Sequence, residues 1–199
     1  NKISLNFKKG DNIIISDSLL SNKTLSSKFK GIIEINPYFN FDMFFDIRNI
    51  SNIESLIKEH SLQITDFIKK NKKLNGNLNI VYESKKYQSK FIKQVDIKLS
   101  LENREIKIPK LFLKFDNGQA LLSGMLTEMN GFQIFEFDLR LNIFDKRKLA
   151  KFLGKKKLKN SEELQIKTSG QINIFSDKIN FKEIIVNKKI IKDKKIIMF

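Results

Sequence analysis

The sequence contains no cysteine and no tryptophan, and its only histidine is His60. Without cysteine, the chain cannot form disulfides, thiolate metal sites or a cysteine nucleophile. A single histidine leaves no second imidazole for a zinc site or a proton relay. The chain therefore lacks the side chains on which most classes of enzyme depend. We expect no catalytic residues, no metal and no cofactor.

Glycine and proline are also scarce, with 8 and 2 among 199 residues. The glycines never form the G-x-G-x-x-G or Lys-Ser/Thr patterns of phosphate-binding loops. No stretch approaches the roughly 18 uncharged apolar residues of a membrane helix. The chain begins with Asn1 and ends in the apolar run 196–199. We therefore expect it to be an internal fragment, so that a missing leader or anchor says nothing about location.

The net charge is +16, from 38 Lys and Arg against 22 Asp and Glu. Lysine replaces arginine and isoleucine replaces valine almost throughout, a bias typical of an A/T-rich genome. Proteins that bind phosphate usually use arginine, whose planar fork grips it at two points. Among the lysine runs, Lys155, Lys156 and Lys157 are candidates for contact with anionic lipid headgroups. The alternative is a solvated basic surface.

Isoleucine, leucine and phenylalanine dominate the rest of the sequence, and they alternate with polar residues. Alternation with period two predicts strands that have one apolar and one polar face. We expect an all-β fold with minor α content, a long curved antiparallel sheet that forms an open groove. The predicted strands are 3–8, 13–16, 30–36, 39–47, 75–83, 87–94, 95–101, 105–115, 119–127, 132–143, 164–174 and 179–186.

The sequence also predicts turns, a bulge and short helices between or within these strands. The pair Asn117-Gly118 is typical of a tight hairpin turn. The apolar phase slips between Ile134 and Glu136, which predicts a β-bulge there. Ser51 is positioned to cap a short helix over 52–59, and a weaker helical pattern follows over 65–72. Asp145 is positioned to cap another short helix over 146–153.

The order of these elements repeats. A glycine, a strand, a turn, a Phe-Asp strand and a capped helix occur from Gly31 and again from Gly124, at an offset of 93 to 96 residues. We interpret the chain, 1–199, as one fragment of a larger repeat-built sheet, with approximate units 29–115 and 116–186.

These segments resemble the C-terminal AsmA-like region of the AsmA family of envelope proteins. The resemblance is carried by 30–35, 41–47 and above all by 115–124 running on to 137–145, and it covers roughly 29–186. It implies a β-groove on the periplasmic side of a Gram-negative inner membrane, tethered by a helix outside this fragment. It further implies a non-catalytic, bridge-like carrier that shields or guides phospholipid acyl chains in outer-membrane biogenesis. We expect no nucleic-acid partner and no obligate oligomer.

A lipid groove needs one continuous apolar face, because each buried CH₂ of an acyl chain gains about 0.8 kcal/mol. Phenylalanine supplies 18 of the 21 aromatic residues, and rings without polar atoms suit such a face. The candidate lining residues are Phe39, Phe41, Met43, Phe45, Ile47, Leu78, Ile80, Tyr82, Val95, Ile97, Leu99, Leu101, Leu111, Leu113, Phe115, Leu139, Leu141 and Ile143.

Other interpretations stay open from the residues alone. The same stripes suit a closed core, packed on a second sheet or on the helices, in a structural or protein-binding envelope module. The charge also permits a basic nucleic-acid-binding β-domain. A glycosidase is disfavoured, since Asp42 and Asp46 lie about 13 Å apart along a strand, against roughly 5–9.5 Å in such enzymes. We expect His60 to be a surface residue at a helix end.

Overall fold

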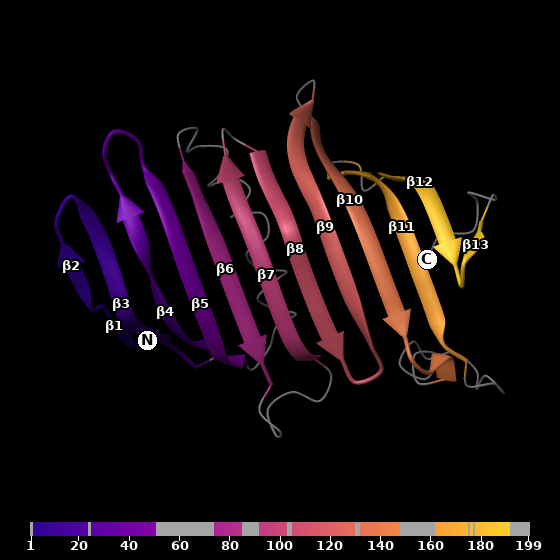
Figure 1. Ribbon diagram of the computed structural model, residues 1–199, viewed down its shortest axis with the longest axis horizontal. Coiled ribbons are helices and arrows are strands. Elements are labelled where there is room, and N and C mark those ends of the chain that lie inside the picture. Colours follow the sequence, from indigo (N-terminus) through magenta and orange to yellow (C-terminus); the bar gives the residue numbers. More distant parts are fainter. Residues whose placement is uncertain are drawn as a thin grey trace.

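The computed structural model describes residues 2–23, 25–50, 74–84, 92–102, 105–129, 132–147, 162–174, 176 and 178–191. These residues form one sheet of 13 strands (Figure 1). The strands are β1 (Lys2–Ser4), β2 (Phe7–Lys9), β3 (Asn12–Ser21), β4 (Leu25–Glu34), β5 (Asn40–Ile50), β6 (Asn75–Glu83), β7 (Ile92–Glu102), β8 (Glu105–Phe115), β9 (Gly118–Met129), β10 (Phe132–Ile143), β11 (Leu164–Asn173), β12 (Lys178–Val186) and β13 (Lys189–Ile190).

The strands lie in the sheet almost in the order of the sequence. From β3 to β13 each strand pairs with the next, and both β1 and β2 pair with β3. All pairs are antiparallel except β5 and β6, which run parallel. The predicted antiparallel sheet is thus wrong at this one step. Parallel neighbours need a crossover of a dozen or more residues, and the chain between Ile50 and Asn75 is long enough.

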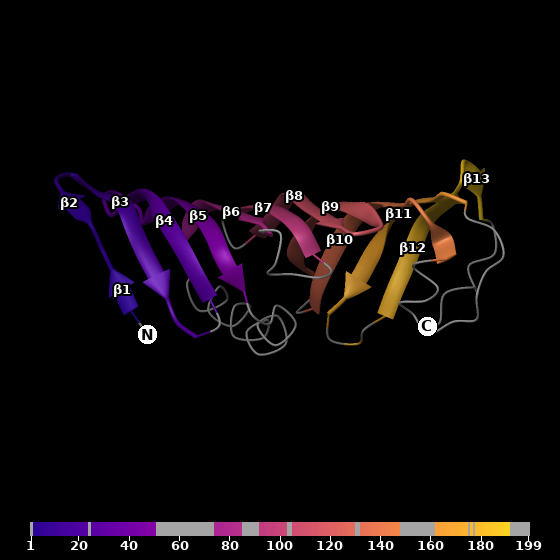
Figure 2. The ribbon, with the colours of Figure 1, turned by 90° about the horizontal axis from the view of Figure 1, so that it is seen from below.

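The sheet is a single, open and curved layer. Every substantial contact between described strands joins neighbours within the sheet. In Figure 2, strands β3 to β5 and β10 to β12 extend below the level of the middle strands β6 to β9, away from the side that faces the viewer in Figure 1. The predicted all-β class with an open, curved sheet is confirmed. Among the described residues, no helix has the length and apolar character needed to cross a membrane.

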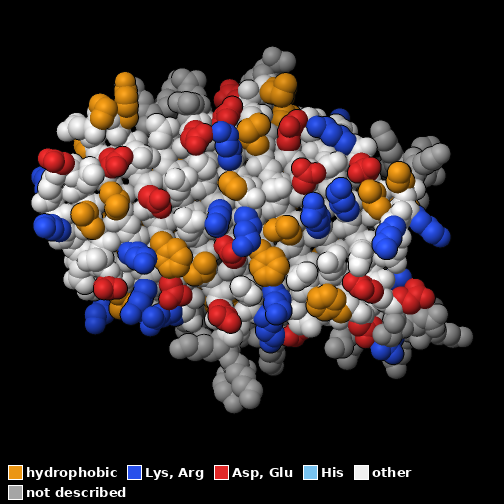
Figure 3. All heavy atoms as spheres, viewed as in Figure 1, with side chains coloured by type: hydrophobic (Ala, Val, Ile, Leu, Met, Phe, Trp, Pro, Cys, Tyr) orange, Lys and Arg blue, Asp and Glu red, His pale blue; other side chains and the backbone are white. Residues whose placement is uncertain are grey.

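The register separates the side chains into two faces, since directly paired residues point to the same side of a sheet. One face carries charges of both signs together with scattered apolar side chains (Figure 3). Pairs such as Lys28 with Asp46 and Asp138 with Ser123 belong to this polar face. The opposite face is apolar.

Several strand boundaries differ from the prediction. The expected strand 3–8 is split into β1 and β2, because the N–H of Asn6 donates to the Ser18 hydroxyl (3.0 Å) instead of to a strand carbonyl. Residues 95–101 belong to the longer strand β7, which begins at Ile92. Of the expected strand 87–94, positions 87–91 lie outside the described residues.

The predicted bulge between Ile134 and Glu136 is absent. Strand β10 pairs without interruption from Phe132 to Ile143 with both of its neighbours where they overlap. The change in apolar alternation has another explanation. Phe132 and Ile134 lie on the polar face, and Phe132 is 53% exposed. Register shifts occur elsewhere, for example where Ser169 and Gly170 of β11 pair with Glu183 and Phe181, which leaves Lys182 of β12 as the extra residue.

Asp145 caps a helical turn as predicted. Its Oδ1 accepts a hydrogen bond from the N–H of Arg147 (2.9 Å), and residues 146 and 147 are helical. Arg147 also forms an ion pair with Asp145 (3.0 Å), which raises the pKa of the guanidinium through that hydrogen bond and charge. The predicted helices over 52–59 and 65–72, the cap Ser51, and 148–153 lie outside the described residues.

The two predicted repeat units differ in strand direction. After β5 the chain returns parallel in β6, whereas after β10 it returns antiparallel in β11. The repeat over 29–115 and 116–186 therefore stays a prediction about sequence, with pairing that is not the same in both units.

Candidate functional site

The apolar face of the sheet is continuous over ten strands, β3 to β12. A single row of paired residues crosses all ten without a charged side chain. In order, the row is Ser18, Phe29, Phe45, Ile80, Ile97, Leu111, Leu122, Leu139, Thr168 and Ile184. We use the name apolar face for the side of the sheet that contains this row.

The predicted lining residues gather on this face. All of them except Phe39 lie in β5 to β10 with their side chains on the apolar side, as the register shows. Phe39 precedes β5 and is 40% exposed. The predicted headgroup contacts Lys155, Lys156 and Lys157 lie outside the described residues, as does His60.

Burial is concentrated on the apolar face but is incomplete there. Among the described residues, the buried hydrophobic side chains all belong to it, and they include Tyr82, Val95, Leu101 and Ile143 from the predicted lining. The other lining residues in the strands, such as Phe45 and Leu139, are half-buried. At the edges the face is open, since Phe7 is 58% and Ile179 48% exposed.

Three hydroxyl groups are also buried on the apolar face, and each forms a hydrogen bond with the backbone. Ser18 accepts from Asn6 N, Ser27 donates to the carbonyl of Asp46 (3.2 Å), and Thr168 donates to the carbonyl of Glu183 (2.8 Å). All three lie beside shifts in strand register. Within the described residues, no buried side-chain nitrogen or oxygen lacks a partner. The face therefore presents little polarity outward.

Aromatic rings lie close to the sheet on this face, over positions occupied by glycine. Phe137 has Gly124 and Gly170 as its neighbours on either side. It stacks with Phe135 (6.3 Å between ring centroids) and meets Phe181 edge to face (6.2 Å). A Cβ at Gly124 would lie 2.6 Å from the Phe135 ring. Glycine thus allows the rings to pack directly against the backbone of the sheet.

The polar face holds ion pairs rather than a one-sided charge. Lys107 pairs with Glu102 (2.7 Å), Lys110 pairs with Asp96, and Lys93 pairs with Asp116 (3.1 Å). The hydrogen bond from Lys107, with its charge, lowers the pKa of Glu102, and the same contact raises the pKa of Lys107. Several lysines of this face are therefore offset by neighbouring acids.

The carboxylates of Asp42 and Asp46 are set apart from the apolar face. Asp42 and Asp46 lie on the polar face of β5, and Asp46 is 3.6 Å from the Arg48 guanidinium. No group of three His, Asp or Glu side chains in the described ranges is arranged to hold a metal ion.

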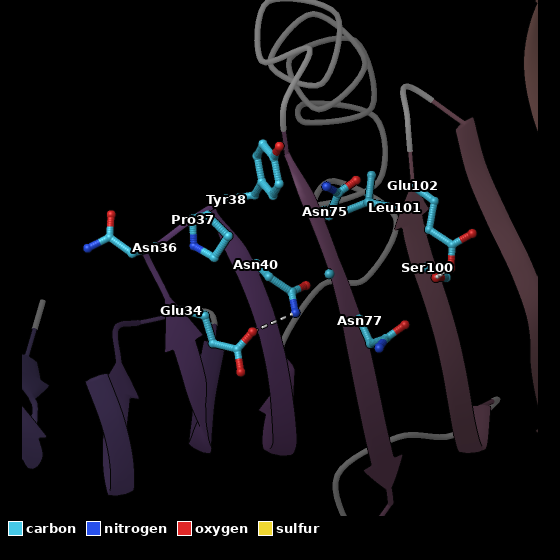
Figure 4. A pocket seen from close by; sticks show the side chains of 11 residues that line it. Glu34, Asn36, Pro37, Tyr38, Asn40, Asn75, Asn77, Ser100, Leu101 and Glu102 are labelled. Carbon is cyan, nitrogen blue, oxygen red and sulfur yellow. Dashed lines mark hydrogen bonds between the residues drawn. The ribbon is translucent and has the colours of Figure 1, made fainter. Parts of the chain in front are cut away.

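A second feature lies where strands β4 to β7 meet one rim of the sheet. It is a hollow of about 460 Å³, which we call the polar hollow (Figure 4). Its lining consists of Glu34, Asn36, Pro37, Tyr38, Asn40, Asn75, Gly76, Asn77, Ser100, Leu101 and Glu102.

The parallel pairing of β5 and β6 creates this hollow. Because both strands begin at the same rim, Asn40 is paired with Asn75 and the loop before β5 lies beside the start of β6. The strand pattern of the sequence did not predict this hollow. The clustering of asparagine near residues 36–40 and 75–79 was the available signal, but asparagine is abundant throughout this chain.

Comparisons with known proteins add no relatives. No family model matches the sequence, no curated protein is significantly similar to it, and no solved structure matches its fold at a significant level. The resemblance to the AsmA-like region thus rests on the sequence segments given above.

Proposed function

We propose that this chain is a non-catalytic, AsmA-like module whose apolar face shields or guides phospholipid acyl chains. In this proposal the protein acts in the periplasm, between the inner and the outer membrane, and is held by an anchor outside this fragment. The single observation that supports it best is the uncharged row of side chains across ten strands of one open sheet.

Physical chemistry favours a hydrocarbon as the occupant of such a face. An acyl chain offers no hydrogen bonds, and the buried hydroxyls of Ser18, Ser27 and Thr168 already bond within the protein. Each methylene of the lipid that leaves water gains about 0.8 kcal/mol. A continuous face lets that gain accumulate along the tail without a polar gap.

Exposure of the face at its edges fits a surface along which a tail could enter. Exposed apolar patches above a few hundred Å² mark binding surfaces in soluble proteins. Ile3 and Phe7 at one edge, 68% and 58% exposed, and Ile179 near the other extend the apolar face to both sides of the sheet.

The test is lipid retention. The 199-residue chain is purified without detergent from Gram-negative cells, and bound phospholipid is measured by mass spectrometry of an organic extract. We expect phospholipid in excess of that carried by an unrelated β-protein of similar charge. An extract without excess lipid would favour a closed, protein-binding module, and steep salt-dependent binding to single-stranded DNA would favour a nucleic-acid-binding domain.

A further inference from the structure

The polar hollow has a hydrogen-bonding capacity that the apolar face lacks. Asn40 Nδ2 donates to Glu34 Oε2 (3.1 Å), which leaves the second oxygen of Glu34 and the amide oxygen of Asn40 as acceptors. The carboxamides of Asn36 and Asn77 are exposed in the same hollow. Each carboxamide offers donors and an acceptor side by side.

An exposed aromatic ring stands next to these polar groups. Tyr38 lies in the loop between β4 and β5 and is 69% exposed. In Figure 4 its ring stands above Asn40 and beside Asn75. A tyrosine ring supplies a flat apolar surface together with a polar hydroxyl.

The charge of the hollow narrows the class of ligand. Glu102 is offset by Lys107, whose Nζ lies 2.7 Å from Oε2 and 3.9 Å from Glu105. Glu34 is then the remaining carboxylate of the lining, which repels phosphate and other anions. An apolar ligand would leave the amides without partners, at a cost in free energy. A neutral ligand with many hydroxyl groups fits both conditions.

We propose that the polar hollow binds a neutral saccharide. Asn36, Asn77 and Glu34 hydrogen-bond the sugar hydroxyls, and the C–H face of a sugar ring packs on Tyr38. The volume of about 460 Å³ is within the range of small-molecule pockets. Asn40 and Asn77 belong to the polar side of the sheet, so the site does not depend on occupation of the apolar face.

The proposal is tested on the full ¹⁵N-labelled chain by NMR titration with maltose, cellobiose and diacetylchitobiose. We expect saturable shifts of the Asn36 and Asn77 side-chain amides and of the Tyr38 backbone for at least one of these disaccharides. Tyr38→Ala and Asn77→Ala each lower the affinity about tenfold or more. Leu121→Ala, at another exposed apolar position on the polar face, leaves it unchanged.

Other outcomes overturn the proposal. Unshifted amides for all three disaccharides up to about 20 mM exclude a saccharide site of useful affinity. Saturable binding of ethanolamine at Glu34, with no response to the disaccharides, assigns the hollow to amines instead. Dodecyl maltoside, used below its micelle concentration, identifies the source of the saccharide. Tighter binding than that of maltose indicates a glycolipid, and equal binding indicates a free glycan. Both results support a saccharide site.

Discussion

The Thr168 hydroxyl of β11 donates a hydrogen bond to the Glu183 carbonyl of β12, 2.8 Å away, beside the point where the register of the two strands shifts. Thr168→Val keeps the shape of the side chain but removes the donor at a position only 6% exposed. We expect a loss of about 0.5–1.5 kcal/mol in the free energy of unfolding. Urea denaturation measures it, with Thr127→Val on the polar face as the control. Equal stability of the two variants would contradict the role of the hydroxyl.

Gly124 lies where the strands β9 and β10 approach too closely for a side chain. A Cβ there would be 2.4 Å from the Glu136 carbonyl oxygen, which belongs to the backbone and cannot rotate away. We expect Gly124→Ala to destabilise the protein by about 1–3 kcal/mol. Gly10→Ala is the matched control, because the nearest atom to its Cβ would be 4.0 Å away. Comparable urea midpoints for both variants would show that the sheet adjusts freely at Gly124.

A charge on the apolar face should abolish lipid retention if that face is the binding surface. Phe45 lies in the central row, stacked on Phe29 at 5.5 Å between ring centroids. We expect Phe45→Arg to lose the bound phospholipid and to keep a far-ultraviolet circular dichroism spectrum near that of the wild type. Burying an unpaired charge in a closed core costs far more free energy than placing it on an open surface. An unfolded Phe45→Arg variant would therefore identify a closed core.

The matched control for Phe45 is Ile32→Arg. Ile32 lies on the polar face of β4, is 43% exposed and is paired with Asp42, which suits a new arginine. This variant adds the same side chain to the neighbouring strand but on the opposite face. Lipid loss in Ile32→Arg as well would point to a general effect of charge.

The ion pair between Glu102 and Lys107 predicts a small dependence of stability on pH. The pKa of Glu102 is lowered, so its contribution is present above the ordinary glutamate value of 4.5 and is lost as the pH falls through the lowered value. The pKa of Lys107 is raised, so its contribution is present below 10.5 and is lost as the pH rises through the raised value.

Glu102→Gln tests this pH dependence. We expect it to be slightly less stable than the wild type at neutral pH and equally stable in acid, where Glu102 is protonated in both states. Urea midpoints at the two pH values measure the difference, with Glu128→Gln on β9 as the control. A difference that persists unchanged in acid would assign the effect to something other than the ion pair.

Alternation of residues predicted the strands well where both faces of a strand have a clear character. The bounds of β6, β8 and β10 agree with the predicted 75–83, 105–115 and 132–143. The side of the sheet on which the apolar residues gather was also predictable, because the period of two assigns each residue to a face. The predicted strand start at Phe39 differs by one residue, because β5 begins at Asn40.

Pairing direction could not be predicted from the same pattern. Alternation fixes the face of a residue but carries no information on whether the next strand returns parallel or antiparallel. The connection between β5 and β6 is longer than a hairpin turn, so no turn residue fixes the direction. The polar hollow depends on that direction, since Asn36 and Asn77 approach each other only when both strands start at one rim.

The near-sequential order of the strands has a consequence for how the molecule assembles and diversifies. Each strand from β3 to β12 is held by its immediate predecessor and successor in the chain. Stability in such an arrangement is close to a sum over adjacent pairs, so folding can start in the middle and spread outward, and amide exchange should quicken toward both margins. Whole hairpins can accordingly be gained or lost during evolution at a margin while the central strands keep their partners.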